Sequence, residues 1–198
     1  MSAPTPYATP LELVSRDLEQ GWKRGRAWSS KWVGHHGGTI PGRIAGFQGE
    51  AAMARHLRAA LAAGPGEPDL VLQTGLQVDV RTRIGLQRDL LILPNDIPTR
   101  PYLLVCGAWP SGGPEYGRPS ELWFVGWCYG AEGEKLGRWG LELPSPTWLV
   151  PQAKLRTPAG FRIAYGAKAY PHPGGARTEE APTLPEGKAR ARSAETKG

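Results

Sequence analysis

Hydrophobic and polar residues alternate on both sides of Thr74-Gly75, from Asp69 to Ile84, with the apolar Val71 in the otherwise polar row of the first arm. Side chains one residue apart on a strand point to opposite faces, so a period of two predicts strands with one apolar and one polar face. Gly75 can adopt the positive φ that a tight turn needs. The pattern therefore predicts a β-hairpin. Its apolar face would be built from Leu70, Leu72, Val78, Val80, Thr82 and Ile84.

The length of the turn decides whether the polar residues of the two arms share a face. A two-residue loop would pair Asp69 with Val80 and place the two polar rows on opposite faces. A three-residue loop, Thr74-Gly75-Leu76, would pair Asp69 with Arg81 and bring all the polar residues to one face. Because a slip of one residue would bury carboxylates, we predict the three-residue loop.

This register predicts two carboxylates, Asp69 and Asp79, beside the Arg81 guanidinium on a rigid sheet face. Mg²⁺ prefers oxygen ligands and is often held by one or two carboxylates together with a substrate phosphate. A cation beside the metal stabilises the charge that develops on a phosphodiester under attack. The same residues could instead form an ordinary cross-strand ion pair on a solvated face, which contributes at most about 1 kcal/mol. The hairpin alone leaves both alternatives open.

Other apolar patterns predict helices before the hairpin and strands after it. Thr9-Pro10-Leu11-Glu12 has the Thr, Pro and Glu of a helix start, and this helix should fade near Gly21 to Gly25. A second helical stripe extends from about Phe47 to Ala62. Short apolar runs between Pro or Gly predict buried strands at 89–93, 102–109 and 121–129, and edge strands or irregular packing at 148–152 and 161–165.

Glu50 lies on or beside the apolar stripe of the second predicted helix. A carboxylate near a helix N-terminus is favoured by the helix dipole, so a position at the edge of the stripe is one explanation. A buried carboxylate, however, needs a partner. If the apolar stripe packs against the hairpin, Glu50 approaches Asp69 and Asp79, and this proximity is the second explanation.

Two segments resemble the motifs of the PD-(D/E)XK nuclease superfamily. Pro68-Asp69, followed by Asp79-Val80-Arg81 at the end of an apolar strand, resembles the motif that gives the superfamily its name. Upstream, Gly46-Phe47-Gln48-Gly49-Glu50 is similar to the Gly-x-x-Gly-Glu that opens the first helix of those proteins. The departure is Arg81, which stands where the motif has Lys. In general pattern the resemblance extends from about Ile44 to Val125.

The resemblance implies one α/β domain with a restriction-endonuclease-like fold, in which helices flank a mixed central β-sheet. It implies that Asp69, Asp79 and the Val80 carbonyl hold Mg²⁺, or Mn²⁺ in its place, with Glu50 joining directly or through a water. It also implies hydrolysis of DNA phosphodiester bonds, with Arg81 holding the scissile phosphate. Arg81 cannot act as a general base, because a guanidinium keeps its proton in proteins. Given the resemblance, we favour the arrangement in which Glu50 faces the hairpin.

The charge balance is positive, because 24 Lys and Arg residues against 18 Asp and Glu residues give a net charge of +6. This balance favours a polyanionic partner such as DNA. Basic and aromatic residues also interleave from Trp22 to Trp32, which is typical of segments that follow phosphates and stack on bases. Alternatively, the tryptophans anchor the core and the cations are solvated. The candidate nucleic-acid contacts are Lys23, Arg24, Arg26, Lys31 and Arg83.

The 198 residues are enough for one domain with a hydrophobic core. We expect a flexible N-terminus at 1–8, the nuclease-like domain at 9–168 and a disordered, basic, Pro/Gly-rich tail at 169–198. No apolar run in the sequence approaches the length of a membrane span. Cys106 and Cys128 lie in apolar runs without a disulfide or zinc pattern, which predicts buried free thiols in a reducing cytoplasm.

Three functions are compatible with the sequence. The first is a Mg²⁺-dependent DNA endonuclease, for which a homodimer is also conceivable. The second is a nucleic-acid-binding protein with the same fold and without catalysis, which the replacement of the motif Lys by Arg81 favours. The third is a small structural or regulatory protein, which would explain the 27 glycines and 20 prolines equally well.

Overall fold

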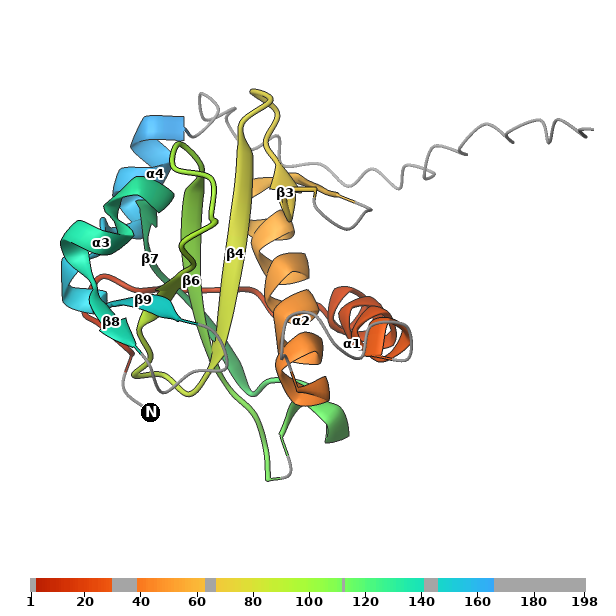
Figure 1. Cartoon of the computed structure of the whole chain (residues 1–198). Coiled ribbons are helices and arrows are strands. Elements are labelled where there is room, and N and C mark those ends of the chain that lie inside the picture. Colours follow the sequence, from red (N-terminus) through yellow and green to blue (C-terminus); the bar gives the residue numbers. More distant parts are fainter. Residues whose placement is uncertain (1–2, 30–38, 63–66, 112, 141–145, 166–198) are drawn as a thin grey trace, which may run out of the picture.

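The computed structural model describes residues 3–29, 39–62, 67–111, 113–140 and 146–165, which form two sheets with helices around them (Figure 1). The large sheet is mixed and has the order β1-β7-β6-β4-β3-β2, and a small antiparallel sheet has the order β5-β9-β8. The large sheet contains β1 (Thr9–Pro10), β2 (Ala60–Leu61), β3 (Leu70–Val71), β4 (Gln77–Ile84), β6 (Pro101–Ala108) and β7 (Glu121–Tyr129). The small sheet contains β5 (Leu90–Ile92), β8 (Arg138–Gly140) and β9 (Thr147–Val150). The helices are α1 (Ser15–Ser29), α2 (Ile40–Leu57), α3 (Gly133–Leu136) and α4 (Pro158–Tyr165).

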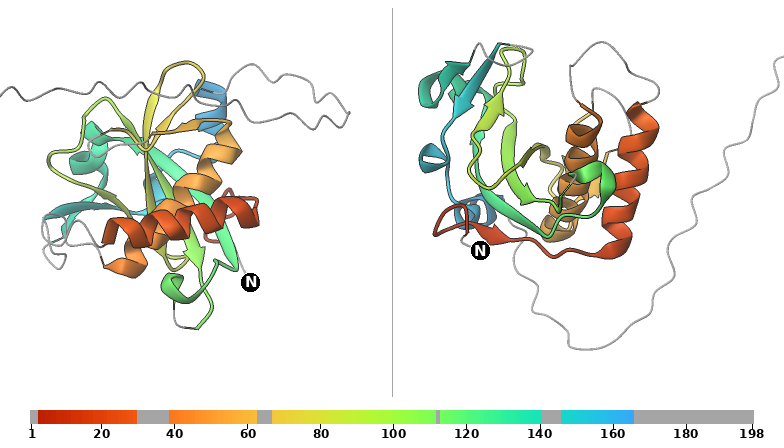
Figure 2. Two further views of the ribbon diagram at one scale, coloured as in Figure 1. Left: turned by 90° about the vertical axis from the view of Figure 1, so that its right-hand side faces the viewer. Right: turned by 90° about the horizontal axis from the view of Figure 1, so that it is seen from below.

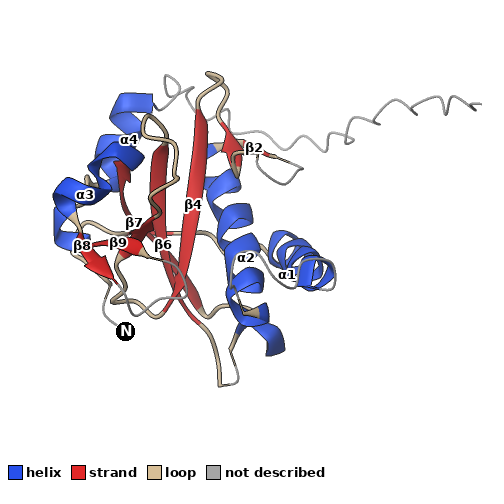
Figure 3. Cartoon of the chain, in the orientation of Figure 1, coloured by secondary structure: helices blue, strands red, loops and turns tan. Residues whose placement is uncertain are grey.

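The large sheet has a hydrophobic core on each face. On one face, residues of α2 and α4 pack against the sheet, and α1 lies outside α2 (Figures 1 and 2). The central side chains of this core are Met53, Leu70, Val78, Val80, Leu103, Val105, Phe124 and Phe161. The small sheet covers part of the other face (Figure 3). That second core contains Leu90, Ile92, Tyr102, Leu104, Cys106, Val125, Cys128, Val150 and Leu155.

Strands β4 and β6 run parallel, with Asp79 opposite Tyr102 and Arg81 opposite Leu104. Paired residues on neighbouring strands point to the same face, so Asp79 and Arg81 lie on the face of the small sheet. The intervening Val80 belongs to the core under α2. The predicted separation of polar and apolar residues along β4 is therefore confirmed.

Several predictions about the architecture are confirmed. The protein is mixed α/β, with a mixed sheet flanked by helices. The predicted buried strands correspond to β5, β6 and β7. Cys106 and Cys128 are buried free thiols, and burial raises the pKa of Cys106 to about 11 and that of Cys128 to about 12. In the part of the chain that the structure describes, no helix combines the length and apolar character needed to cross a membrane.

The predicted start of the first helix at Thr9 is wrong. Thr9 and Pro10 form β1 instead, paired with β7, and the Leu11 N–H donates to the Leu122 carbonyl at 2.9 Å. Backbone pairing at the edge of the sheet therefore prevails over the local capping signal, and Pro is tolerated there because an edge strand leaves some N–H groups unused. The helix begins at Ser15.

The predicted fading of this helix near Gly21 is also wrong, because α1 continues to Ser29. The glycines are the points at which α1 approaches α2. A Cβ at Gly21 would lie 2.8 Å from the Phe47 carbonyl oxygen, and one at Gly25 would lie 2.7 Å from the Ile44 Cα. Tertiary contact therefore offsets the low helix propensity of glycine.

The second helix begins earlier and ends earlier than predicted. It starts at Ile40 rather than Phe47, because the Thr39 side chain accepts a hydrogen bond from the Gly42 N–H at 3.2 Å and caps the helix. It ends at Leu57, because Arg58 adopts the left-handed conformation with φ 52°. The next residues turn back into the sheet as β2.

The register of the hairpin is shifted by two residues from the predicted one. Leu70 pairs with Val78, so Asp69 is level with Asp79 and not with Arg81. The predicted loop began one residue too late: Gly75, with φ 82°, is its last residue rather than its middle one. A three-residue loop of this kind places the left-handed residue last. A shift by two preserves the parity, so the polar residues still share a face.

Residues 158–165 form α4, so the predicted edge strand or irregular packing at 161–165 is wrong. The Thr157 Oγ1 accepts a hydrogen bond from the Gly160 N–H at 3.2 Å, and Pro158 occupies the first turn, where its missing N–H has no cost. Near the N-terminus, the Tyr7 hydroxyl donates to the Gln152 carbonyl at 3.2 Å. The predicted tail at 169–198 lies outside the described residues.

Candidate functional site

Helix α2 contacts β4 at the two glycines that precede Glu50. The Thr82 hydroxyl donates to the Gly46 carbonyl at 3.5 Å. A Cβ at Gly49 would overlap the side chain of Thr82, so only glycine allows this close approach. The Gly-x-x-Gly-Glu segment thus has a structural role: it brings α2 onto β4 and positions Glu50 so that the charges of Asp69 and Asp79 act on its carboxyl group.

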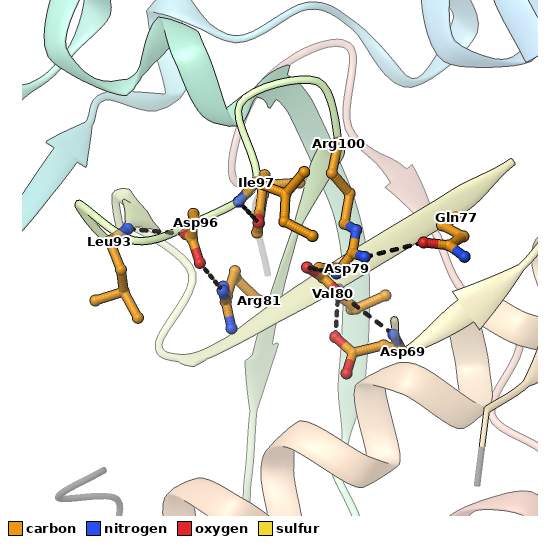
Figure 4. A network of polar contacts seen from close by, with 10 residues as sticks. Asp69, Gln77, Asp79, Val80, Arg81, Leu93, Asp96, Ile97 and Arg100 are labelled. Atoms are coloured by element: carbon orange, nitrogen blue, oxygen red, sulfur yellow. Dashed lines mark hydrogen bonds and ion pairs between the residues drawn. The ribbon is translucent and has the colours of Figure 1, made fainter. Parts of the chain in front are cut away.

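Asp69 and Asp79 hold each other in place just before β3 begins. The Asp69 N–H donates to the Asp79 Oδ1 at 3.2 Å, and the Val80 N–H donates to the Asp69 Oδ2 at 2.7 Å (Figure 4). The backbone pairing of β3 with β4 extends only to Leu70 and Val78 on this side. Beyond that pair, the two carboxylates accept the hydrogen bonds. The predicted proximity of the two aspartates is confirmed, and Val80 contributes its N–H to the network.

Arg100 forms an ion pair with the second carboxylate oxygen of Asp79. Its Nη1 lies 3.1 Å from the Asp79 Oδ2, and its Nη2 donates to the Gln77 Oε1 at 3.0 Å (Figure 4). The side chains of Arg100 and Asp79 are only 11% and 10% exposed, so water screens this ion pair poorly. Both Asp79 oxygens are therefore engaged.

Arg81 is held by a different acid, Asp96. The Arg81 Nη2 lies 2.8 Å from the Asp96 Oδ1, and the guanidinium lies over the Tyr102 ring, 5.1 Å from its centroid. The Asp96 Oδ2 also accepts the Leu93 N–H at 2.8 Å. Arg81 thus shares the face of Asp79 but pairs with the turn that follows β5 (Figure 4).

The carboxyl groups of Glu50 and Asp69 have unusual proton affinities. Burial, followed by the nearby charge of Asp69, raises the pKa of Glu50 to about 8. Burial also raises the pKa of Asp69 to about 6, against the hydrogen bond from Val80. The Glu50 carboxylate makes no hydrogen bond or ion pair within the described residues. Such perturbed carboxyl groups gather at functional sites more often than elsewhere.

The donor set suits a hard cation such as Mg²⁺, because it consists of carboxylate oxygens. Glu50 has no competing partner in the part of the chain that the structure describes, and Asp69 uses only its Oδ2 in the hydrogen bonds described above. Among the described residues, however, no three His, Cys, Asp or Glu side chains are arranged to hold a metal ion. Both oxygens of Asp79 are engaged, so coordination of a metal by Asp79 would require its ion pair with Arg100 to open.

The basic residues predicted on the first helix are spread over several contacts. Lys23 makes an exposed ion pair with Glu19 at 2.9 Å. The Arg24 Nη2 donates to the Ala62 carbonyl at 2.8 Å, and its guanidinium lies over the Phe47 ring. The positive charge of Arg24 also acts on Glu50. Arg24 therefore links α1 to the residue that follows β2.

The other predicted contacts lie apart from one another. Arg26 lies over the ring of Trp22, whose Nε1 donates to the Glu115 carbonyl at 3.3 Å. Lys31 lies outside the described residues. Arg83 lies on β4, two residues beyond Arg81.

No protein-family profile and no curated protein matches the chain. Its chemistry must therefore be inferred from the residues themselves.

Arg100 and Asp96 are site residues that the sequence pattern did not indicate. Arg100 directly precedes β6, and the parallel pairing of β6 with β4 brings it beside Asp79. Asp96 lies in a turn in which its N–H donates to the Leu93 carbonyl at 3.0 Å. Asp96 follows Pro94-Asn95, a turn signal that could have located this turn, but only the tertiary pairing of strands shows which arginine it meets.

Proposed function

We propose that this protein is a metal-dependent nuclease that hydrolyses phosphodiester bonds of DNA, on a fold of the restriction-endonuclease type. One observation carries the proposal: the Asp69 N–H donates to the Asp79 carboxylate, and the charges of both aspartates help to raise the pKa of Glu50 on α2. Like-charged carboxylates at partly buried positions repel one another unless they share protons or a cation. A divalent cation would relieve this repulsion, and Mg²⁺ is the cation best suited to such oxygen ligands.

Each residue has a role that follows from its contacts. Glu50, Asp69 and Asp79 would hold the metal, with Asp79 available once Arg100 has moved from its Oδ2. The bound metal would act as a Lewis acid and lower the pKa of its water. Arg81, with its side chain 30% exposed, would bind the phosphate and stabilise its developing charge. Its planar fork suits phosphate oxygens better than a lysine ammonium does.

A second candidate is a nucleic-acid-binding protein without catalysis. The observation that favours it is the pairing of Asp79 with Arg100 and of Arg81 with Asp96. These ion pairs already neutralise the carboxylate and the guanidinium that the hydrolysis would use. In this case the acidic residues stabilise the sheet, and the basic residues bind the nucleic-acid backbone.

Cleavage of plasmid, linear, branched and single-stranded DNA in Mg²⁺, Mn²⁺ or EDTA separates the two candidates. The nuclease predicts metal-dependent cleavage that Asp79→Asn reduces by several orders of magnitude, while DNA binding in EDTA persists. Arg81→Lys should weaken substrate binding if Arg81 grips phosphate through two hydrogen bonds. Asp17→Asn is the matched control. Asp17 lies on α1 and, like Asp79, pairs with an arginine, in this case Arg55 of α2.

Absence of metal-dependent cleavage in the wild type, in Asp79→Asn and in Arg81→Lys on every DNA form would refute the nuclease. Salt-sensitive DNA binding in the same samples would then select the second candidate. If the protein neither cleaves nor binds DNA, both candidates fail and a structural role replaces them.

A further inference from the structure

The end of β4 and the loop after it carry two arginines, Arg83 and Arg88, that make no ion pair with a described residue. Arg83 is the penultimate residue of β4, and Arg88 lies in the loop before β5. Three other arginines in this region each have an acid within 4 Å. These pairs are Arg81–Asp96, Arg100–Asp79 and Arg138–Asp89.

Arg83 is only partly exposed, and its Nε is buried without a hydrogen-bond partner among the described residues. A buried, unpaired donor on a charged group is costly, so its presence suggests a missing acceptor. Burial, followed by the charge of Arg88, lowers the pKa of Arg83. The charge of Asp89 acts in the opposite direction but has a smaller effect than that of Arg88, and an anion bound by the two guanidinium groups would relieve their repulsion.

The protein holds Arg88 in place through its backbone and one side-chain nitrogen. The Gln152 Nε2 donates to the Arg88 carbonyl at 3.0 Å, and the Arg88 Nε donates to the Ile84 carbonyl at 3.1 Å. The side chain folds back over Gly85, whose φ of 101° forms the turn. These contacts leave the two terminal nitrogens of Arg88 without a partner in the described residues. Arg88 is thus pre-positioned while its charged end remains exposed.

We propose that Arg83 and Arg88 form an oxyanion site that binds a backbone phosphate of a nucleic acid. In its identification of the ligand, this inference rests on the proposed function. Arg81 and Arg83 are two residues apart on one face of β4, so their Cα atoms are separated by roughly 7 Å along the strand. A polyanion that follows β4 can therefore contact the Arg81 position and the Arg83–Arg88 site in succession.

This arrangement directs the nucleic acid along β4 rather than along α1. On α1, Lys23 pairs with Glu19, and Arg24 donates to the Ala62 carbonyl. Arg83 and Arg88 make no ion pair with a described carboxylate. A phosphate can therefore bind them without first displacing an acidic side chain. Asp79 lies on the same strand, β4, as Arg83. A nucleic-acid chain bound at Arg83 and Arg88 can therefore extend along β4 towards Asp79.

The test measures binding of fluorescent single-stranded and double-stranded oligonucleotides in EDTA over a range of salt concentrations. Arg88→Gln is the first variant, because Arg88 is exposed and its replacement should leave the fold intact. Arg83→Gln and the double variant follow, with Arg83→Lys to keep the charge at the partly buried position. Arg162→Gln is the matched control, an exposed arginine on α4.

The double variant should bind about tenfold more weakly, and its salt slope should fall by about 2, or about 1 for each lost phosphate contact. Arg162→Gln should bind like the wild type. Unchanged affinity and slope in the folded double variant would overturn the proposal. Inorganic phosphate provides a second arm: if it stabilises the wild type but not the double variant, and oligonucleotide binding is equal in both, the site binds free phosphate and the nucleic-acid assignment fails.

Cleavage in Mg²⁺ is measured separately, so that the two proposals can fail independently. If the wild type does not cleave but the double variant loses binding, the phosphate site stands and the nuclease fails. If the wild type cleaves and the double variant binds normally, the nuclease stands and the phosphate site fails.

Discussion

The raised pKa of Glu50 predicts that Glu50→Gln changes stability in a pH-dependent way. Glutamine is close in shape to a protonated glutamic acid and cannot ionise. The folded protein holds the Glu50 proton with a pKa of about 8, whereas the ordinary value is 4.5. A folded state that binds its proton more tightly than the unfolded state is favoured at low pH, and this advantage is lost as pH rises from 4.5 to about 8. Replacement by Gln should remove that loss.

The size of the effect follows from the same interval. From 4.5 to about 8, at about 1.4 kcal/mol for each pKa unit, the upper limit is about 5 kcal/mol. Because Glu50 is partly exposed, water and neighbouring side chains reduce this value. We expect Glu50→Gln to gain roughly 2–4 kcal/mol relative to the wild type between about pH 5 and about pH 8.5.

Urea unfolding followed by tryptophan fluorescence in EDTA measures this difference. Glu134→Gln on α3 is the control, because Glu134 is exposed and should show no such pH dependence. An equal effect of Glu50→Gln at both pH values would refute the reasoning, since it would mean that Glu50 has an ordinary pKa. If Glu50 helps to hold Mg²⁺, metal binding by the wild type near neutral pH should also release protons, and Glu50→Gln should release fewer.

Two further substitutions test the packing and the ion pair at the site. Gly49→Ala should destabilise the protein by roughly 1–3 kcal/mol in thermal unfolding, because its Cβ would overlap Thr82. Gly46→Ala, where a Cβ meets nothing within 4 Å, is its control, and equal effects of the two would contradict the close approach. Arg100→Gln should lower the free energy of unfolding in urea by about 3 kcal/mol, because it leaves Asp79 without its cation. Mg²⁺ should restore part of this stability. An unchanged unfolding midpoint would refute the role of the ion pair.

Local sequence patterns were enough to predict the faces of β4 and the short buried strands. Strict alternation places Asp79 and Arg81 opposite Val80, and this separation persists although the hairpin register differs by two residues. The reason is that the side-chain period of a strand is two, so a shift by two leaves each residue on its own face. For Glu50 the apolar stripe left two explanations open, and in the structure the charges of Asp69 and Asp79 act on its carboxyl group.

Tertiary contacts determined the secondary structure of segments in which a local signal and a long-range contact favour different conformations. Thr9 and Pro10 carry a helix-start signal, yet they pair with β7, and Gly21 lies inside a helix because α2 approaches it closely. The ion pairs of the site were decided in the same way. Arg100 meets Asp79 only because β4 and β6 are parallel neighbours. Such pairings join residues distant in the chain, so their energy comes from packing and desolvation that no local pattern contains.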